Sequence, residues 1–407
     1  MDMSLARFKF LFYVFQFFWE FILIYAVDKL FFLYKGLELY HIAILITCWS
    51  ILVMLLQVPT GALADRWKRK NMLVLAGLFI SCGYVTWFFS STFWLFLLGF
   101  VFISLGGTFT SGTFESYVVD FLRLKGKEDE FEKVWGRGSA IRHIGIAVAL
   151  SLGGVASIHS YELVLVLSAL SPLITVGVAL LFPPVRPVTP AQTKGYLSFL
   201  KGGIKRAFSS AILVRVFLYS AIVYATLGIL EEYDQVLLSA WLGLSNSFIG
   251  LWLAIGVGIS SISSFFAYKL RQAGWKVLYT IAIVTGVLLI LLAFFQSLLL
   301  LGILVLLYAF SALMGVLIQG MIQREIKSDE RATITSVCSL VMEGGAVVLG
   351  LSFGFIANEF GIQVGYGFFG LVIIVYLVGQ YIIRKIVVIT KHRGAVEKQR
   401  IKNQNSY

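Results

Sequence analysis

The sequence reads Gly61-Ala62-Leu63-Ala64-Asp65-Arg66-Trp67-Lys68-Arg69-Lys70 between the second and the third of twelve long apolar stretches. Charged side chains are rare elsewhere, because only 13% of the 407 residues are charged while 59% are hydrophobic. Water-soluble domains carry about 25% charged residues. Most of the surface of this chain must therefore face lipid, and the charged segment is a short loop at the membrane surface.

The length of the apolar stretches predicts transmembrane helices. A bilayer core about 30 Å thick needs roughly 20 apolar residues per helical crossing. These runs are continuous and lack the alternation of lipid-facing strands, which excludes a barrel. The predicted crossings are residues 9–32, 39–60, 71–90, 93–121, 138–158, 161–182, 211–232, 246–268, 276–296, 298–322, 333–357 and 364–388. We therefore predict an all-α polytopic membrane protein with twelve transmembrane helices.

The positions of the cations predict the orientation, because Lys and Arg accumulate on the cytoplasmic side. With the N-terminus inside, only Lys29 and Lys35 fall outside, and Arg142 and Arg215 fall within helices. We expect a multi-pass protein of the plasma (inner) membrane with both termini cytoplasmic. The net charge of +12 then faces anionic lipid, where each cation contributes about 1 kcal/mol. The partner is the lipid bilayer, and no nucleic acid is expected.

The chain divides into two similar halves. Residues 183–210 are polar and rich in proline, and the segment 267–276 occupies the place in the second half that the charged segment holds in the first. The predicted units are residues 1–182, an N-terminal six-helix bundle; 183–210, a central cytoplasmic linker; 211–390, a C-terminal six-helix bundle; and 391–407, a cytoplasmic tail. Such a duplication indicates two halves that rock about a central site.

The charged segment matches the G-x-x-x-D-R-x-x-R-K signature of the major facilitator superfamily, in the loop where that family carries it. Twelve crossings and a long central loop agree over the whole chain. The sequence resembles most the 12-helix antiporters that exchange drugs or small molecules for protons. The resemblance implies two pseudo-symmetric six-helix bundles that work by alternating access.

The resemblance also assigns roles to the motif, which starts at Gly61 and includes Arg66. In the family the signature Asp, here Asp65, engages the cytoplasmic end of the eleventh helix. The signature Arg, here Arg69, pairs with an acidic residue at the inner end of the fourth, here best matched by Asp120. Charge-assisted bonds of this kind bias a two-state equilibrium and would latch the inner gate. The alternative is that these cations only fix the topology.

The drug antiporters of the family carry two further motifs from which this chain departs. Residues 106–117 in the fourth crossing contain no Arg, and the fifth crossing keeps Gly145 and the pair Gly153-Gly154 but lacks the proline of G-P-x-x-G-G. Small residues also let transmembrane helices approach closely. The direction of transport therefore stays open.

Two carboxyl groups lie unpaired near mid-depth, Glu20 in the first crossing and Glu343 in the eleventh. A charge in the bilayer core is costly and marks functional sites. We expect both groups to face a central cavity and to take up and release protons as water access alternates. The alternative is a carboxyl group that only hydrogen-bonds between helices.

Other polar residues are candidates for the same cavity. Sequential packing of the fourth and fifth helices places Glu115 with Arg142 and His143, either as a structural ion pair or as a proton relay. Asp234 ends an acidic group with Glu231 and Glu232, which is a mouth that attracts cations or a solvated loop edge. The remaining candidates for the cavity wall are Gln16, Gln57, Gln319 and Gln323.

Aromatic residues crowd around Glu20 from Phe8 to Phe21, and suit either an amphipathic solute or the lipid. Our leading prediction is a proton-coupled secondary transporter that exports a small amphipathic or drug-like molecule. The alternatives are an importer (symporter), a lipid-linked solute carrier, or a membrane-embedded sensor or enzyme on the same scaffold. We expect no enzyme, no catalytic residues, no metal and no cofactor besides the proton gradient, and we expect a monomer.

Overall fold

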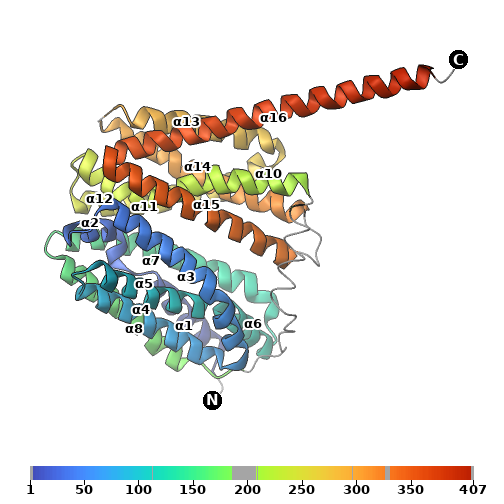
Figure 1. Cartoon of the computed structure of the whole chain (residues 1–407). Coiled ribbons are helices and arrows are strands. Elements are labelled where there is room, and N and C mark those ends of the chain that lie inside the picture. The colour runs from blue at the N-terminus through green and yellow to red at the C-terminus, as the bar shows by residue number, and fades with distance from the viewer. Residues whose placement is uncertain are drawn as a thin grey trace.

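The computed structural model of the chain describes residues 3–111, 113–185, 208, 210–295, 297–325 and 331–404. All regular structure among these residues is helical. Eleven helices of this part are long and apolar enough to cross a membrane. Figure 1 shows the helices of the first half, in blue and green, beside those of the second half, in yellow to red.

The helices follow the predicted crossings closely. In the first half they are α1 (Leu5–Trp19), η1 (Leu23–Ala26), α2 (Asp28–Tyr34), α3 (Leu39–Arg66), α4 (Arg69–Phe88), α5 (Phe93–Thr110), α6 (Thr113–Leu124), η2 (Glu128–Glu130), α7 (Phe131–Ala156) and α8 (Tyr161–Leu181). In the second half they are α10 (Ala211–Tyr219), η3 (Ser220–Tyr224), α11 (Ala225–Val236), η4 (Leu237–Trp241), α12 (Asn246–Phe266), η5 (Ala267–Ala273), α13 (Trp275–Leu292), α14 (Leu299–Glu325), α15 (Arg331–Phe360) and α16 (Ile362–Gln404).

The first crossing is not the continuous helix that we predicted. It breaks after α1 and resumes as η1 and α2. Side chains of α8 satisfy backbone groups on both sides of the break: the Ser171 hydroxyl donates to the Phe18 carbonyl over 2.7 Å, and the Ile24 N–H donates to Ser168 Oγ over 2.9 Å. A break at membrane depth is stable only where the freed groups find such partners.

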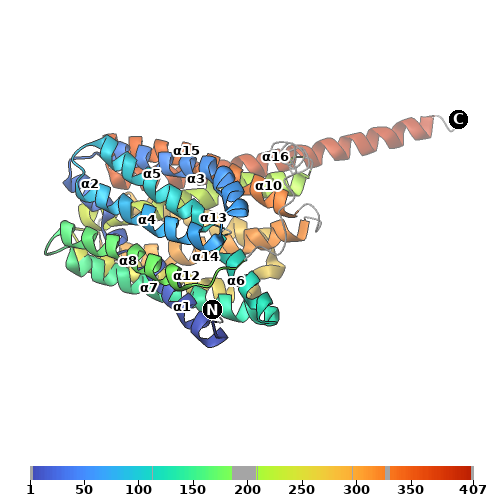
Figure 2. The ribbon, with the colours of Figure 1, turned by 90° about the horizontal axis from the view of Figure 1, so that it is seen from below.

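The other differences are smaller. The charged segment is helical except at Trp67 and Lys68, because α3 runs to Arg66 and α4 begins at Arg69. The predicted crossing 93–121 is divided between α5 and α6. Helix α16 continues through most of the predicted tail and extends beyond the body of the molecule, as Figure 2 shows. Most of the predicted linker lies outside the described residues.

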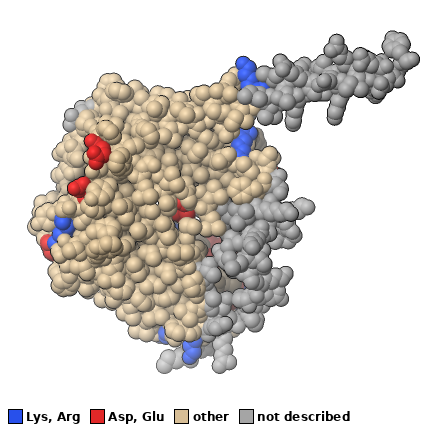
Figure 3. Space-filling model, in the orientation of Figure 1, with Lys and Arg blue, Asp and Glu red and all other residues tan. Residues whose placement is uncertain are grey.

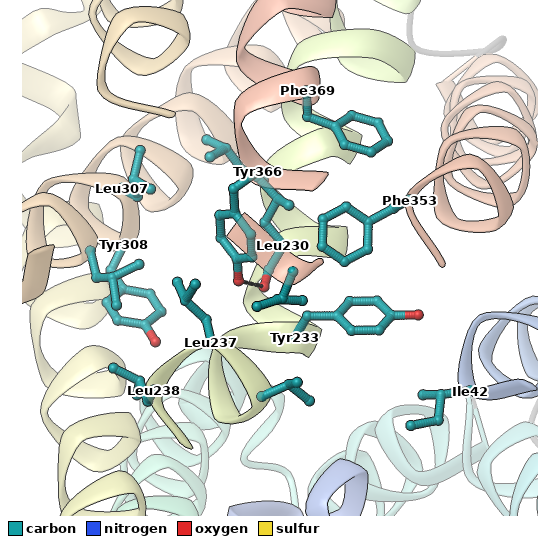
Figure 4. Packing of buried hydrophobic residues seen from close by; sticks show 14 of the residues in the cluster. Ile42, Leu230, Tyr233, Leu237, Leu238, Leu307, Tyr308, Phe353, Tyr366 and Phe369 are labelled. Carbon is teal, nitrogen blue, oxygen red and sulfur yellow. Dashed lines mark hydrogen bonds between the residues drawn. The ribbon is translucent and has the colours of Figure 1, made fainter. Parts of the chain in front are cut away.

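Aromatic side chains fill the interior of each half. In the first half Phe8, Phe12 and Phe15 are fully buried and form core, whereas Phe10 on the same helix is 66% exposed. In the second half Tyr366 lies among buried apolar residues, and its hydroxyl oxygen lies 2.8 Å from the Leu230 carbonyl oxygen (Figure 4). The outer face seen in Figure 3 is largely uncharged, as a lipid-facing surface requires.

The two halves meet at one end of the molecule, which we call the closed end. It contains α2, the beginnings of α3 and α12, and the last turns of α7 and α15. Helix α7 packs on α12 and α3 packs on α15. A Cβ atom at Gly154 would lie 2.5 Å from the Asn246 carbonyl oxygen and 2.9 Å from the Gly250 Cα. Backbones this close require glycine on both helices.

At the opposite end, which we call the open end, the halves diverge. This end contains the beginning of α10 and the last turns of α6 and α12. Figure 1 shows α3 and α15 separating toward it. The close contacts of Gly154 with α12 and of Gly354 with α3 lie at the closed end. The two halves are therefore closest together at this end.

Candidate functional site

A cavity of 1180 Å³ lies between the two halves. Helices of both halves contribute to its wall, which is mostly apolar with a few polar groups, as is typical of small-molecule sites. The aromatic residues of the wall are Tyr25, Trp49, Trp87, Phe100 and Tyr308. The titratable residues other than tyrosine are Asp28, Lys29, His143, Glu231 and Glu232. We call this space the larger cavity.

A buried lysine joins the two halves beside the larger cavity. Lys29, at the start of α2, has a side chain that is only 9% exposed. Its Nζ lies 2.9 Å from Asp28 Oδ2 and 2.5 Å from Glu232 Oε2 on α11. Two carboxylates therefore surround one ammonium group, which offsets the cost of burying its charge.

Gln235 completes this arrangement from the next turn of α11. Its amide nitrogen donates to Asp28 Oδ1 over 2.7 Å and to the Tyr25 carbonyl over 2.9 Å. Its amide oxygen accepts from the backbone N–H of Lys29 over 3.2 Å. We call Asp28, Lys29, Glu232 and Gln235 the Lys29 network. Every contact that it makes between the halves lies at the closed end, and a network with all groups paired holds its parts in one geometry.

The sequence analysis missed this network. We expected Lys29 to lie on the outside, but α2 packs on α11 and the Lys29 side chain enters the interface between the halves. We also left Glu232 and Asp234 as an acidic mouth or a solvated loop edge, and both alternatives are wrong for Asp234, which is only 2% exposed. The adjacent charges of Asp28 and Lys29 at the end of an apolar run were the pattern that could have indicated it.

Asp234 belongs to a separate buried cluster within the second half. Its carboxylate accepts a hydrogen bond from the Tyr366 hydroxyl over 2.8 Å and another from the Tyr308 hydroxyl. Tyr308 also lines the larger cavity. Asp234 therefore lies behind the cavity wall and not in it, whereas its neighbour Glu231 lines the cavity.

Glu20 lies at the break of the first crossing, where it is the C-cap residue of α1. It lines a second cavity of 300 Å³, which we call the smaller cavity. Its side chain is 24% exposed, and one carboxylate oxygen lies 3.6 Å from Nη1 of Arg142 on α7. Glu20 therefore lines a cavity within the first half and not the central cavity that we predicted, and it is paired with Arg142 and not free as we expected.

The expected grouping of Glu115 with Arg142 and His143 is wrong. Arg142 pairs with Glu20, while Glu115 is exposed on α6 and forms no ion pair with any described residue. His143 lines the larger cavity, with its Nδ1 2.8 Å from the Ser139 carbonyl oxygen. The broken first crossing, which carries Glu20, takes the place beside α7 that we gave to the fourth helix.

The other cavity candidates lie in different surroundings. Glu343 is half-buried on α15 and is not among the residues that line either cavity. Gln57 lines the smaller cavity. Gln16 is buried within the first half, and Gln319 is exposed on α14. The Gln323 side chain lies outside the described part of the structure, and the role of Glu343 stays a prediction.

Arg69 and Asp120 form an ion pair that ties α4 to α6. The same Arg69 nitrogen donates to the Ser116 carbonyl over 2.8 Å. This is the pairing that the resemblance implied, and both partners belong to the first half. Their role in gating stays a prediction. Gly61, Asp65 and Arg66 lie outside the residues whose side chains the structure describes.

Comparisons with known proteins agree with this architecture. A family model described as Major Facilitator Superfamily matches residues 10–239. The nucleoside transporter NupG has a similar structure, with a TM-score of 0.76 at 17% identity, over 91% of this chain and 96% of that one. None of the curated proteins matches the chain.

Two further solved structures resemble the chain. A bacterial homolog of the human lysosomal transporter Spinster, in an inward-facing and occupied conformation, has a TM-score of 0.74 at 14% identity, over 94% of this chain and 98% of that one. A D-xylose-proton symporter has a TM-score of 0.64 at 11% identity, over 91% of this chain and 96% of that one. At such low identities these likenesses show the fold alone.

Proposed function

The chain belongs to the major facilitator superfamily, and from this premise we propose that it exports small amphipathic molecules in exchange for protons. Family membership makes the protein a secondary transporter. The direction, the coupling ion and the class of substrate are the content of the proposal. The fold alone does not specify them.

The observation that carries the proposal is the larger cavity, which lies between two halves that meet at one end and diverge at the other. A carrier that alternates between two faces of a membrane needs such a space at the boundary of two rocking units. The mostly apolar wall with aromatic side chains suits an amphipathic solute. Its few charged groups supply contacts for a polar head.

The positive-inside rule supports an assignment of the two ends. The last turn of α6 and the connection after it carry Arg123, Lys125 and Lys127, and they lie at the open end. We therefore place the open end in the cytoplasm, together with both termini, and the closed end outside the cell. In this arrangement the described conformation is open to the inside. We further propose that the protein is a monomer in the plasma (inner) membrane and uses no cofactor besides the proton gradient.

Transport then requires the Lys29 network to open. Separating Lys29 from Glu232 leaves the half-exposed Glu232 carboxylate without its cation, while Lys29 keeps Asp28 on the same helix. Breaking a fully buried ion pair costs roughly 3 kcal/mol or more, and less where water reaches a partner. Shifting a two-state equilibrium from 1:99 to 99:1 takes about 5.5 kcal/mol, so the network supplies part of the bias toward the closed outer end. The signature motif with Arg69 and Asp120 would provide the opposite bias when the inner end closes.

Glu20 and Arg142 support proton coupling. Their contact of 3.6 Å joins two partly exposed groups, and the Glu20 carboxylate lines a cavity that shares wall residues with the larger one. Such a carboxylate can either bind a proton or pair with the guanidinium group. Protonation of Glu20 would therefore break the ion pair that joins the end of α1 to α7. Glu343 on α15 remains the proposed second coupling group.

Reconstitution in liposomes tests the proposal. We expect uptake of amphipathic solutes into inside-out oriented proteoliposomes to depend on an imposed pH gradient, and Glu20→Gln and Glu343→Gln each to abolish that dependence. Glu359→Gln, an exposed acid at the end of α15, is the matched control and should behave as wild type. Flux that ignores the gradient in every variant would remove proton coupling. Flux in the opposite direction would favour the importer, and absence of solute counterflow would favour a sensor or enzyme.

A further inference from the structure

The smaller cavity is a polar recess beside the larger one. It holds 300 Å³, which is enough for the head of a molecule but not for a drug-sized body. Its polar residues are Glu20, Gln57, Ser104, Thr108 and Ser111. They come from the C-cap of α1, from α3 and α5, and from the connection to α6, so this recess belongs wholly to the first half.

Ser104 is the most informative residue of this recess. Its side chain is only 1% exposed, and its hydroxyl has no hydrogen-bond partner among the described residues. Buried hydroxyl groups are almost always paired. Thr108, one turn further on α5, donates to the Leu105 carbonyl over 3.0 Å, so its oxygen can still accept a hydrogen bond. The unpaired Ser104 hydroxyl is therefore available to a polar group of a ligand.

The electrostatics of the recess favour a cation. Glu20 follows the last turn of α1, where the helix carries a partial negative charge that adds to the carboxylate. The only cation near this carboxylate among the described residues is Arg142, at 3.6 Å and with a side chain that is 40% exposed. A guanidinium group held so loosely can be displaced by a better-fitting donor.

The recess connects to a site for an apolar body. Tyr25, Trp49 and Ile103 line both cavities, so one molecule can occupy both. In the larger cavity Trp87 and Phe100 extend the same aromatic wall. A cationic head in the recess would thus be attached to an apolar body that contacts these rings.

We propose that the smaller cavity binds the protonated amine head of the substrate, with Glu20 and Ser104 as hydrogen-bond acceptors. The site is then specific for primary and secondary amines, because their ammonium groups carry at least two N–H groups, one for Ser104 and one for Glu20, whereas a tertiary ammonium ion has one and a quaternary ion has none. The ammonium group replaces Arg142 at Glu20, as a proton does. Proton and substrate compete for the same carboxylate, which is the basis of exchange between them. This inference rests on the proposed transport function.

The test compares two probes with the same apolar body, 4-phenylbutylamine and trimethyl(4-phenylbutyl)ammonium. Binding to the purified full-length protein is followed by quenching of tryptophan fluorescence, since Trp19 and Trp49 line the smaller cavity. We expect the primary amine to bind at least about tenfold more tightly than the quaternary ion, because sites built for hydrogen bonding reject analogues that lack the donor.

Variants test whether the preference for the primary amine arises in the smaller cavity. Ser104→Ala should weaken the primary amine about tenfold and leave the quaternary ion unchanged, whereas Glu20→Gln should weaken both. Ser352→Ala, a half-buried serine on α15 that lines neither cavity, is the control and should match wild type. Gel filtration verifies that each variant is folded. If Ser104→Ala does not fold, Ser104→Cys replaces it in the comparison.

Three results would overturn the inference: equal binding of the two probes by wild type, an equal effect of Ser104→Ala on both, or no binding of either up to millimolar concentration. Flux of other solutes driven by the pH gradient would then show that the proposed function stands without it. Absence of any such flux would instead refute the function itself.

Discussion

The ammonium group of Lys29 lies 2.5 Å from the Glu232 carboxylate and thereby joins α2 of the first half to α11 of the second. The contact is at the closed end, beside the larger cavity. Asp28 accepts a hydrogen bond from the same ammonium group and another from the Gln235 amide nitrogen. A carrier that opens at this end must separate these groups. The free energy of their interaction therefore affects the equilibrium between the two conformations of the transport cycle.

Replacing Lys29 alone should destabilise the protein. Lys29→Met leaves the Asp28 and Glu232 carboxylates without their cation, at a cost of roughly 3 kcal/mol, the lower end of the usual range because the Glu232 side chain is 48% exposed. Thermal unfolding in detergent, followed by gel filtration, would measure this as a lower Tm.

The double variant Lys29→Met/Glu232→Met provides the comparison. It removes both charges and should recover part of the lost stability, because a buried ion pair can be replaced by apolar groups at little cost. A double variant less stable than Lys29→Met would contradict the pairing.

The glycine contact between α7 and α12 should hold the outer end closed. In Gly154→Val the added side chain would meet the Asn246 carbonyl and the Gly250 Cα, so we expect the halves to separate there. Labelling of Ala140→Cys, a position that lines the larger cavity, reports this change. A membrane-impermeant maleimide should reach it from the inside in the parent protein and from the outside in Gly154→Val.

Gly177→Val is the matched control for that experiment. A Cβ atom at Gly177 on α8 meets nothing within 4 Å, so the labelling should stay as in the parent. If Gly154→Val labels like the control, the α7–α12 contact does not hold the outer end closed.

The ion pair of Arg69 with Asp120 should be needed for transport and not only for the topology. Arg69→Gln removes the ion pair with Asp120 and the bond to the Ser116 carbonyl, and we expect transport to fall at least about tenfold, as for a coupling of a few kcal/mol. Arg123→Gln, also on α6, breaks an exposed ion pair of 2.5 Å with Glu128 of η2 and should transport as wild type. Initial rates of uptake in proteoliposomes compare the two, and equal rates would mean that these cations only fix the topology.

Asp234 should act as a structural anchor of the second half. Tyr366→Phe removes one of its two tyrosine hydrogen bonds and leaves a buried carboxylate oxygen without that donor, which costs about 1–3 kcal/mol. Tyr381→Phe, which lies at a residue that is 66% exposed, should leave Tm unchanged. A Tm of Tyr366→Phe equal to that of Tyr381→Phe would show that the hydrogen bond contributes nothing.

Much of the architecture was predictable from the sequence, because hydropathy and the charged segment at residues 61–70 depend only on local composition. The break after α1 was not, since the apolar run continues through it and the partners that stabilise it, Ser168 and Ser171, lie about 150 residues away. The same break moves Glu20 next to Arg142 and carries Lys29 into the interface.

The polar site was predictable only as a set of residues. Glu231, Glu232 and Asp234 are neighbours in sequence but have different surroundings. Glu231 lines the larger cavity and forms no ion pair with a described residue, Glu232 pairs with Lys29, and Asp234 is enclosed by tyrosines. Successive residues of a helix point in different directions, and the rotation of α11 depends on packing against helices far away in the chain.

The measurement that tests the account most directly is a pair of distances between spin labels in the same protein, with Cys48, Cys82 and Cys338 replaced by serine. One pair, Trp94→Cys and Phe360→Cys, spans the closed end, and the other, Leu124→Cys and Tyr268→Cys, spans the open end; all four residues are highly exposed. We predict that Lys29→Met lengthens the distance at the closed end and shortens the one at the open end in the same fraction of molecules. Two distances that stay fixed, or that change in the same direction, would contradict alternating access controlled by the Lys29 network.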